Sequence, residues 1–191
     1  MNNLSKRILL IAIPIIITSG LVSWYISNIG SSSGIPEGSC SVKKILLGVN
    51  AFPAGTTALF DESFENSASD SASYLFRNQD DGFDANHRIE YYNTFFLAWQ
   101  AYKYNHKIFR EDKYSGPWIS PSREIFTSQV ASQYNFACAN DAVLGNQCIL
   151  IARYGRYFVF FRSSVTQKFA VMDIAPLLQE IDARISPCIS K

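Results

Sequence analysis

An uncharged apolar segment near the N-terminus constrains what this chain can fold into more than any other feature. The segment runs from Ile8 to Ile26, directly after the basic pair Lys6 and Arg7, and it contains no charged residue. As a helix, these ~19 residues rise about 28 Å, close to the ~30 Å thickness of the hydrocarbon core of a bilayer. The sequence therefore predicts one N-terminal transmembrane helix over residues 8–27, in contact with the lipid bilayer.

The distribution of basic residues predicts the orientation of that helix. No Lys or Arg occurs between Arg7 and Lys43, and basic residues that flank a membrane helix favour the cytoplasmic side. We expect a single-pass protein of the cell membrane, with a cytoplasmic stub at residues 1–7 that is too short to signal by itself and a C-terminal domain outside the cytoplasm. A cleaved signal peptide is the alternative, and it would place the domain in the same compartment.

Residues 28–39 are rich in Gly and Ser and contain Pro36, a composition typical of a flexible linker. The remaining residues, 40–191, suffice for one extracytoplasmic domain with a core of ordinary size. Without Lys6 and Arg7 the 17 basic residues fall to 15, against 16 acidic residues. This balance argues against nucleic acid as a partner and against strong binding to anionic lipid surfaces.

All four cysteines follow the predicted membrane helix, and an even number of cysteines outside the cytoplasm favours disulfide bonds. Three pairings are possible. We expect Cys138 to pair with Cys148 across a turn-rich stretch, and Cys40 to pair with Cys188, which would join the two ends of the domain. A zinc site needs more closely spaced cysteines, and no cofactor is predicted.

Hydrophobic periodicity predicts two helices. From Arg88 to about Lys113 aromatic residues recur at helical spacing, which predicts one long amphipathic helix whose aromatic stripe is core rather than the lining of a ligand cleft. A second helix is expected to begin near Asp173 and to bury one face made of Leu177, Leu178, Ile181 and Ile185.

Two β-rich runs, at residues 148–153 and 156–161, meet at a turn that contains Gly155, which predicts a β-hairpin. The second run has little polar interruption, so we expect it to be a central strand covered by a helix. Residues 52–60, 73–77 and 125–137 are further strand candidates. The domain is therefore predicted to be α+β, an antiparallel sheet packed by the long amphipathic helix and the C-terminal helix.

Three segments carry a resemblance to a known group of domains. They are Leu46–Gly55, with the pattern Leu-Leu-x-x-x-x-Phe-Pro-x-Gly, the hairpin Ile151–Tyr157, and the helical segment Ile181–Ile185. In these segments the chain resembles small bacterial membrane-anchored extracytoplasmic domains of the sensor-domain and LpqN-like lipoprotein type. The resemblance implies a binding or sensing role.

The sequence contains none of the common catalytic motifs, so we expect no enzymatic activity. The candidate residues for contact with a ligand or partner are at the hairpin tip and on the aromatic stripe: Arg153, Tyr154, Arg156, Tyr157, Trp99 and Tyr102. In the loop 78–86, the carboxylates of Asp80, Asp81 and Asp84 are a weaker candidate for Ca²⁺, because the spacing is not that of an EF-hand and such residues also make ordinary turns. We expect His106 to pack in the core and His87 to face solvent.

Two functions remain open. In the first, the chain is an anchored binding or sensing module without catalytic activity, with a partner outside the cytoplasm. In the second, it is a structural accessory subunit of a larger membrane protein complex, and Pro14, Ser19 and Gly20 mark the helix face that packs against other subunits.

Overall fold

The computed structural model describes residues 40–61, 68–111, 116–122, 125–141 and 145–189. The chain divides into two compact units, Met1–Ser33 and Gly34–Lys191, and all described residues belong to the second. The predicted cytoplasmic stub, transmembrane helix and linker lie outside the described residues. Within the described part, no helix is long and apolar enough to cross a membrane.

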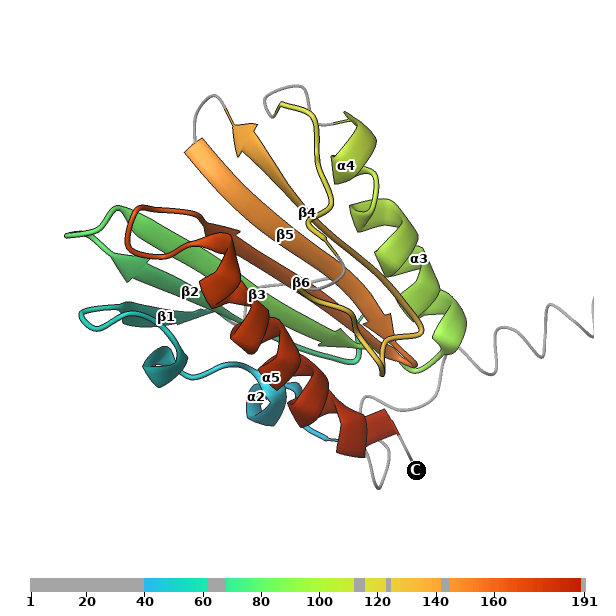
Figure 1. Ribbon diagram of the computed structural model, residues 1–191. Helices are drawn as coiled ribbons and strands as arrows, with labels where there is room; N and C mark the ends of the chain where they lie inside the picture. Colours follow the sequence, from blue (N-terminus) through green and yellow to red (C-terminus); the bar gives the residue numbers. More distant parts are fainter. Residues whose placement is uncertain (1–39, 62–67, 112–115, 123–124, 142–144, 190–191) are drawn as a thin grey trace, which may run out of the picture. The chain divides into compact units, whose positions relative to one another are not determined.

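Six antiparallel strands form one sheet in the order β1-β2-β3-β6-β5-β4 (Figure 1). The strands are β1 (Thr57–Asp61), β2 (Asp70–Asn78), β3 (Phe83–Tyr91), β4 (Gln133–Asp141), β5 (Gly145–Tyr154) and β6 (Tyr157–Ser164). The helices are α2 (Val42–Ile45), the 3₁₀ turn η1 (Val49–Ala51), α3 (Phe95–Asn105), α4 (Ile108–Glu111) and α5 (Val171–Ile189). The predicted α+β class with an antiparallel sheet is confirmed.

Helices cover both faces of the sheet: α5 and α2 lie on one face and α3 on the other (Figure 1). Because side chains alternate along a strand, β6 contributes Val159 and Phe161 to the core beneath α5 and Phe158 to the core beneath α3. The predicted buried face of α5 is confirmed at all four positions, Leu177, Leu178, Ile181 and Ile185.

The predicted hairpin is also confirmed. Tyr154 of β5 pairs with Tyr157 of β6, and Gly155 between them has φ of 60°, a conformation that glycine adopts without steric cost. Strand β6 is hydrogen-bonded to β3 on one side and to β5 on the other, which makes it the central strand expected from its apolar sequence.

The single long helix predicted from Arg88 to Lys113 is wrong at its N-terminal end and in its middle, where a turn at residues 106–107 separates α3 (Phe95–Asn105) from the short α4 (Ile108–Glu111). Residues up to Tyr91 continue β3, and α3 begins only at Phe95, after Thr94, whose Oγ1 accepts a hydrogen bond from the Leu97 amide at 3.2 Å. Ile89 suits both an alternating strand pattern and a helical pattern, so the aromatic spacing did not show where the strand ends and the helix begins. The N-cap residue Thr94 marks that boundary. The predicted strand 125–137 is likewise shifted, because β4 begins at Gln133.

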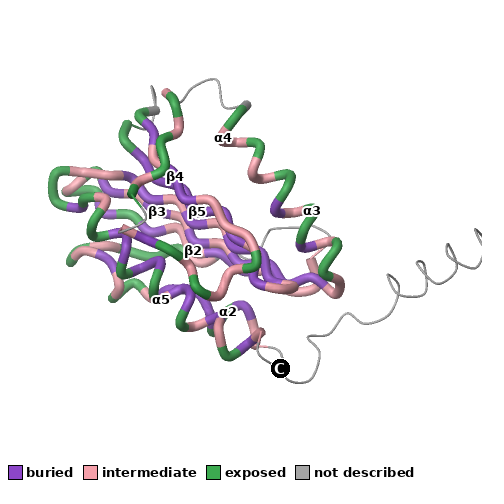
Figure 2. The backbone as a smooth tube through the Cα atoms, turned by 45° about the vertical axis from the view of Figure 1, so that its right-hand side comes forward, coloured by how far each residue is buried: buried purple, intermediate pink, exposed green. Residues whose placement is uncertain are grey.

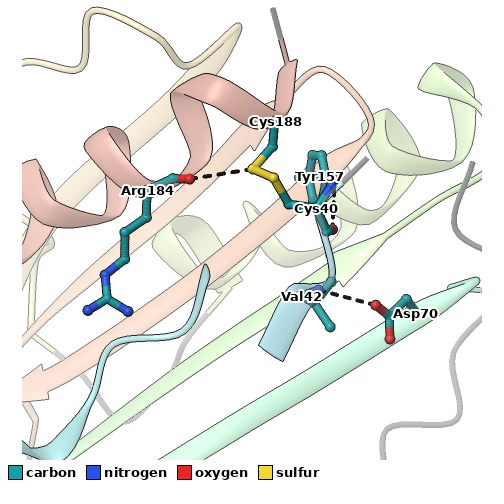
Figure 3. The surroundings of a disulfide bond; sticks show 6 residues. All are labelled: Cys40, Val42, Asp70, Tyr157, Arg184 and Cys188. Carbon is teal, nitrogen blue, oxygen red and sulfur yellow. Dashed lines mark hydrogen bonds between the residues drawn. A yellow bond between two sulfur atoms is a disulfide. The ribbon is translucent and has the colours of Figure 1, made fainter. Parts of the chain in front are cut away.

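Both predicted disulfides are present, Cys40–Cys188 and Cys138–Cys148. The first joins the start of the domain to the end of α5 (Figure 3). There the Tyr157 hydroxyl accepts a hydrogen bond from the Cys40 amide and donates one to the Cys40 carbonyl, both at 3.0 Å. Cys138 and Cys148 lie opposite each other on β4 and β5. The place where the chain enters the domain is thus fixed by a covalent bond and by two hydrogen bonds.

Removing the two disulfides should have unequal costs. Cys40 and Cys188 are 148 residues apart and Cys138 and Cys148 only 10. In the chain-entropy model their loss lowers the free energy of unfolding by about 5 and about 3 kcal/mol respectively. Urea unfolding of the Cys40→Ser/Cys188→Ser and Cys138→Ser/Cys148→Ser variants measures both values. A larger loss for the second variant would contradict the expectation.

His87 does not face solvent as predicted; it is fully buried. Its position in β3 turns the ring toward the α5 face, where it packs edge-on against Phe161. Its Nδ1 accepts a hydrogen bond from the Leu47 amide at 3.1 Å. Burial, together with the nearby positive charge of Arg184, lowers the pKa of His87 from 6.5 to about 3. The imidazole is therefore neutral in the folded domain at neutral pH.

This buried imidazole predicts a loss of stability in acid. In the unfolded chain His87 takes up a proton as the pH falls below about 6.5, whereas in the folded domain it does so only near pH 3. Between these two pH values the folded state binds fewer protons than the unfolded chain. The contribution of neutral His87 to the free energy of unfolding is therefore fully present above pH 6.5. It falls as the pH is lowered, by about 2 kcal/mol between pH 7.5 and pH 5.

The variant His87→Gln should lack this contribution, because a neutral side-chain amide does not titrate. Urea unfolding at the two pH values, for the parent chain and the variant, measures the difference. His106→Gln is the control, since the pKa of His106 is lowered too but its ring is only half-buried, so it should change the pH dependence less. An unchanged pH dependence in His87→Gln would refute this account.

Candidate functional site

The two tyrosines of the predicted hairpin-tip surface lie in the core rather than at the surface. Tyr154 and Tyr157 are 0% and 2% exposed. The Tyr154 hydroxyl donates a hydrogen bond to Asp182 of α5 at 2.6 Å, and burial, followed by the charge of Asp182, raises the pKa of Tyr154. Tyr157 holds Cys40. Both side chains support α5 and the start of the domain, because strand alternation turns them to that face.

The two arginines of the tip have different surroundings. Arg153 is held locally: its Nε donates to Gln133 Oε1 at 3.2 Å and its Nη1 to the Gly155 carbonyl at 3.1 Å. The guanidinium of Arg156 lies over the ring of Phe95, 5.2 Å from the ring centre. Arg156 therefore belongs to a surface formed jointly by the turn and the first residues of α3.

The aromatic stripe of α3 is only partly core. Tyr102, a candidate contact residue, is buried together with Ala98; this agrees with the predicted core role of the stripe and not with a contact at the surface. Phe95, Phe96 and Trp99 are 57%, 47% and 39% exposed. The rings of Phe96 and Trp99 stack with centres 5.8 Å apart. Figure 2 shows exposed stretches along α3, which packs on the sheet by a narrow face. We call Phe95, Phe96, Trp99 and Arg156 the α3 aromatic surface.

A buried ionic cluster lies beneath α3. Glu90 is 1% exposed, and its Oε1 lies 3.3 Å from Arg88 Nε. Its Oε2 accepts a hydrogen bond from the Tyr92 hydroxyl at 2.6 Å, and Arg88 Nη2 donates to Asn105 of α3 at 3.1 Å. Burial, then the charge of Glu90, raises the pKa of Tyr92. These contacts tie α3 to β3, and sequence spacing did not reveal them.

His106 is half-buried between the rings of Tyr102 and Phe109, with centre distances of 5.5 Å to each. Its Nε2 lies 3.3 Å from Asn135 Nδ2 of β4. This position agrees with the expected packing role.

The three acidic residues proposed as a weak calcium candidate have basic or local partners. Asp81 pairs with Lys168, and Asp84 pairs with Arg162. The Asp80 amide donates to the side-chain oxygen of Asn78 at 3.2 Å, as in an ordinary Asx turn. In the part of the chain that the structure describes, no three His, Cys, Asp or Glu residues are grouped so that they could hold a metal ion.

An apolar pocket of about 560 Å³ lies at the end of the sheet where β4 and β5 are joined. The register of β5 places it at the opposite end from the β5–β6 turn, roughly 30 Å away along the strand. Its described lining comes from four segments: Gly116, Pro117, Ile119, Pro121, Ile125, Cys138, Ala139, Asn140, Asn146, Gln147, Val165 and Val171. We call it the distal pocket.

The backbone fixes one wall of the distal pocket. The amide and carbonyl of Ile119 exchange hydrogen bonds with those of Cys138, both at 2.9 Å, and the Gly116 amide donates to the Asn140 carbonyl at 2.7 Å. This short bridge lays the segment along the edge of β4. The Ile119 side chain is nevertheless 67% exposed. Sequence reasoning missed the pocket because its walls are distant in sequence; the Pro and Ile residues after Gly116 were the available signal.

Comparison of the chain with models of protein families, with curated protein sequences and with solved structures found no match in any of the three. The resemblance to sensor-type and LpqN-like domains therefore remains a prediction from the sequence. The distal pocket and the α3 aromatic surface are the features of the described residues that bear on function.

Proposed function

We propose that this protein is a membrane-anchored extracytoplasmic binding module that takes a small, largely apolar molecule into the distal pocket. The observation that carries the proposal is the pocket itself, about 560 Å³ in volume and lined mainly by apolar side chains. Ligand sites commonly measure roughly 300–1,000 Å³ and combine an apolar lining with a few polar groups.

The polar groups of the distal pocket suit recognition better than catalysis. Asn140, Asn146 and Gln147 contribute carboxamides, which donate and accept hydrogen bonds but do not titrate. Cys138 is in a disulfide bond, and the described lining contains no ionisable side chain. An apolar ligand with one hydrogen-bonding end is the chemistry that this lining favours.

The proposed compartment is supported by independent features of the chain. Both disulfides would persist in an oxidising environment outside the cytoplasm. The apolar segment after Lys6 and Arg7 supports an anchor with the same orientation.

A charge at the mouth of the distal pocket should weaken binding. Placing a carboxylate against an apolar ligand costs a desolvation penalty, so Ile119→Asp should lower the affinity of an apolar probe about tenfold. The measurement is a fluorescence titration of the full chain in detergent with N-phenyl-1-naphthylamine. Leu59→Asp is the matched control, because Leu59 on β1 is 66% exposed and Ile119 is 67% exposed.

Equal affinities for the two variants would refute the assignment of the pocket. The same detergent preparation addresses the alternative function: membrane subunits that co-purify in fixed stoichiometry would favour a structural accessory subunit over a binding module.

A further inference from the structure

The α3 aromatic surface lies beside the place where the chain enters the domain. A Cβ atom added at Gly155 would be 3.6 Å from Phe95 Cε1 and 3.8 Å from Ile189 Cγ2. The first turn of α3 and the end of α5 therefore meet at the β5–β6 turn. Residue 188, next to Ile189, is disulfide-bonded to Cys40 (Figure 3).

The length of chain before Cys40 limits how far this surface can lie from a membrane. If residues 8–27 form the proposed anchor, residues 28–39 are all that separates it from Cys40. A flexible linker of ~12 residues has a root-mean-square length of about 20 Å and a maximum reach of about 40 Å. The end of the domain that carries the α3 aromatic surface is then held near the bilayer at a high effective concentration.

The residues around the α3 aromatic surface have the composition of a membrane interface. The one charged residue of α3 is the basic Lys103. The Lys103 ammonium lies 5.8 Å from the centre of the Trp99 ring. Exposed Phe and Trp beside basic residues favour the boundary between headgroups and acyl chains, particularly in anionic lipid.

The near-neutral charge of the whole domain does not oppose this contact. Attraction to a lipid surface acts over about one Debye length, ~8 Å at physiological ionic strength, so the charges on the contacting face decide it. Folding places Arg156 from the β5–β6 turn beside α3, which adds a basic residue that the local sequence of the helix lacks.

We propose that the α3 aromatic surface contacts the anionic phospholipid bilayer that anchors the chain, with Phe95, Phe96 and Trp99 at the headgroup level. The distal pocket is then held at the far end of the sheet, open to the extracytoplasmic side. This inference depends on the proposed anchor and orientation but not on the identity of the pocket's ligand.

Quenching of Trp99 by brominated lipid tests the contact. The full chain is reconstituted in vesicles of phosphatidylglycerol and phosphatidylcholine brominated on the acyl chains. A Trp24→Phe background removes the tryptophan of the predicted anchor, and the share due to Trp99 is the quenching lost in Trp24→Phe/Trp99→Phe. Adding Phe95→Glu and Phe96→Glu should reduce that share at least about threefold.

Leu59→Glu with Met172→Glu is the matched control, because these side chains are 66% and 65% exposed elsewhere on the domain; it should leave the quenching unchanged. Circular dichroism of each variant checks that the domain remains folded. Absence of Trp99 quenching in vesicles would overturn the inference. A cross-link from Trp99 to another protein or to a second copy of this chain, without quenching, would overturn it as well.

A second tryptophan variant distinguishes failure of the surface contact from failure of the membrane anchor. In a Trp99→Phe/Trp118→Phe variant, Trp24 is the one remaining tryptophan, so quenching reports insertion of the predicted membrane helix. Quenched Trp24 with unquenched Trp99 would reject the surface contact and leave the anchored module intact. If neither is quenched, both the anchor and the contact are rejected. The probe titration of the distal pocket is unaffected by either result.

Discussion

The central strand β6 is the element on which the rest of the domain depends. It is paired on both sides, with β3 and β5, and both of its faces are covered by helices. Val159 and Phe161 lie beneath α5, and Phe158 lies beneath α3. Removing apolar area from water on both faces at once supplies the largest favourable contribution to folding. This one strand therefore positions both helices: α5, which supplies core contacts on one face, and α3, which carries the exposed aromatic residues on the other.

The two ends of the sheet have different properties. At the β5–β6 turn the disulfide Cys40–Cys188 and the Tyr157 hydroxyl fix the start of the domain. At the other end, β4 and the bridge to Ile119 frame the distal pocket. The proposed membrane contact and the proposed ligand site lie at these two opposite ends of the strands.

Much of the fold was predictable because its signals are local. The hairpin at Gly155 and the buried face of α5 followed from apolar runs and turn residues. The expected disulfides are both present, although the sequence left three pairings open. The candidate site was much less predictable. Tyr154 and Tyr157 were expected at the surface but are buried, since their orientation depends on which face of β5 and β6 each residue occupies. His87 was expected in solvent, yet β3 is one of the two central strands of the sheet, and the ring is buried there. Spacing alone does not reveal which strands are internal.

By itself the sequence determined the fold class, the hairpin and the C-terminal helix, because hydrophobic period and turn chemistry are properties of short segments. It left three cysteine pairings open, and the folded chain pairs Cys40 with Cys188 and Cys138 with Cys148. Only the tertiary structure decided which aromatic residues are exposed and where the pocket lies. Phe95, Phe96 and Trp99 share a helical spacing with buried Tyr102, and they differ because α3 packs on the sheet through Ala98 and Tyr102. The distal pocket exists because segments distant in the chain meet at the end of the sheet where β4 and β5 are joined, a proximity that no local pattern contains.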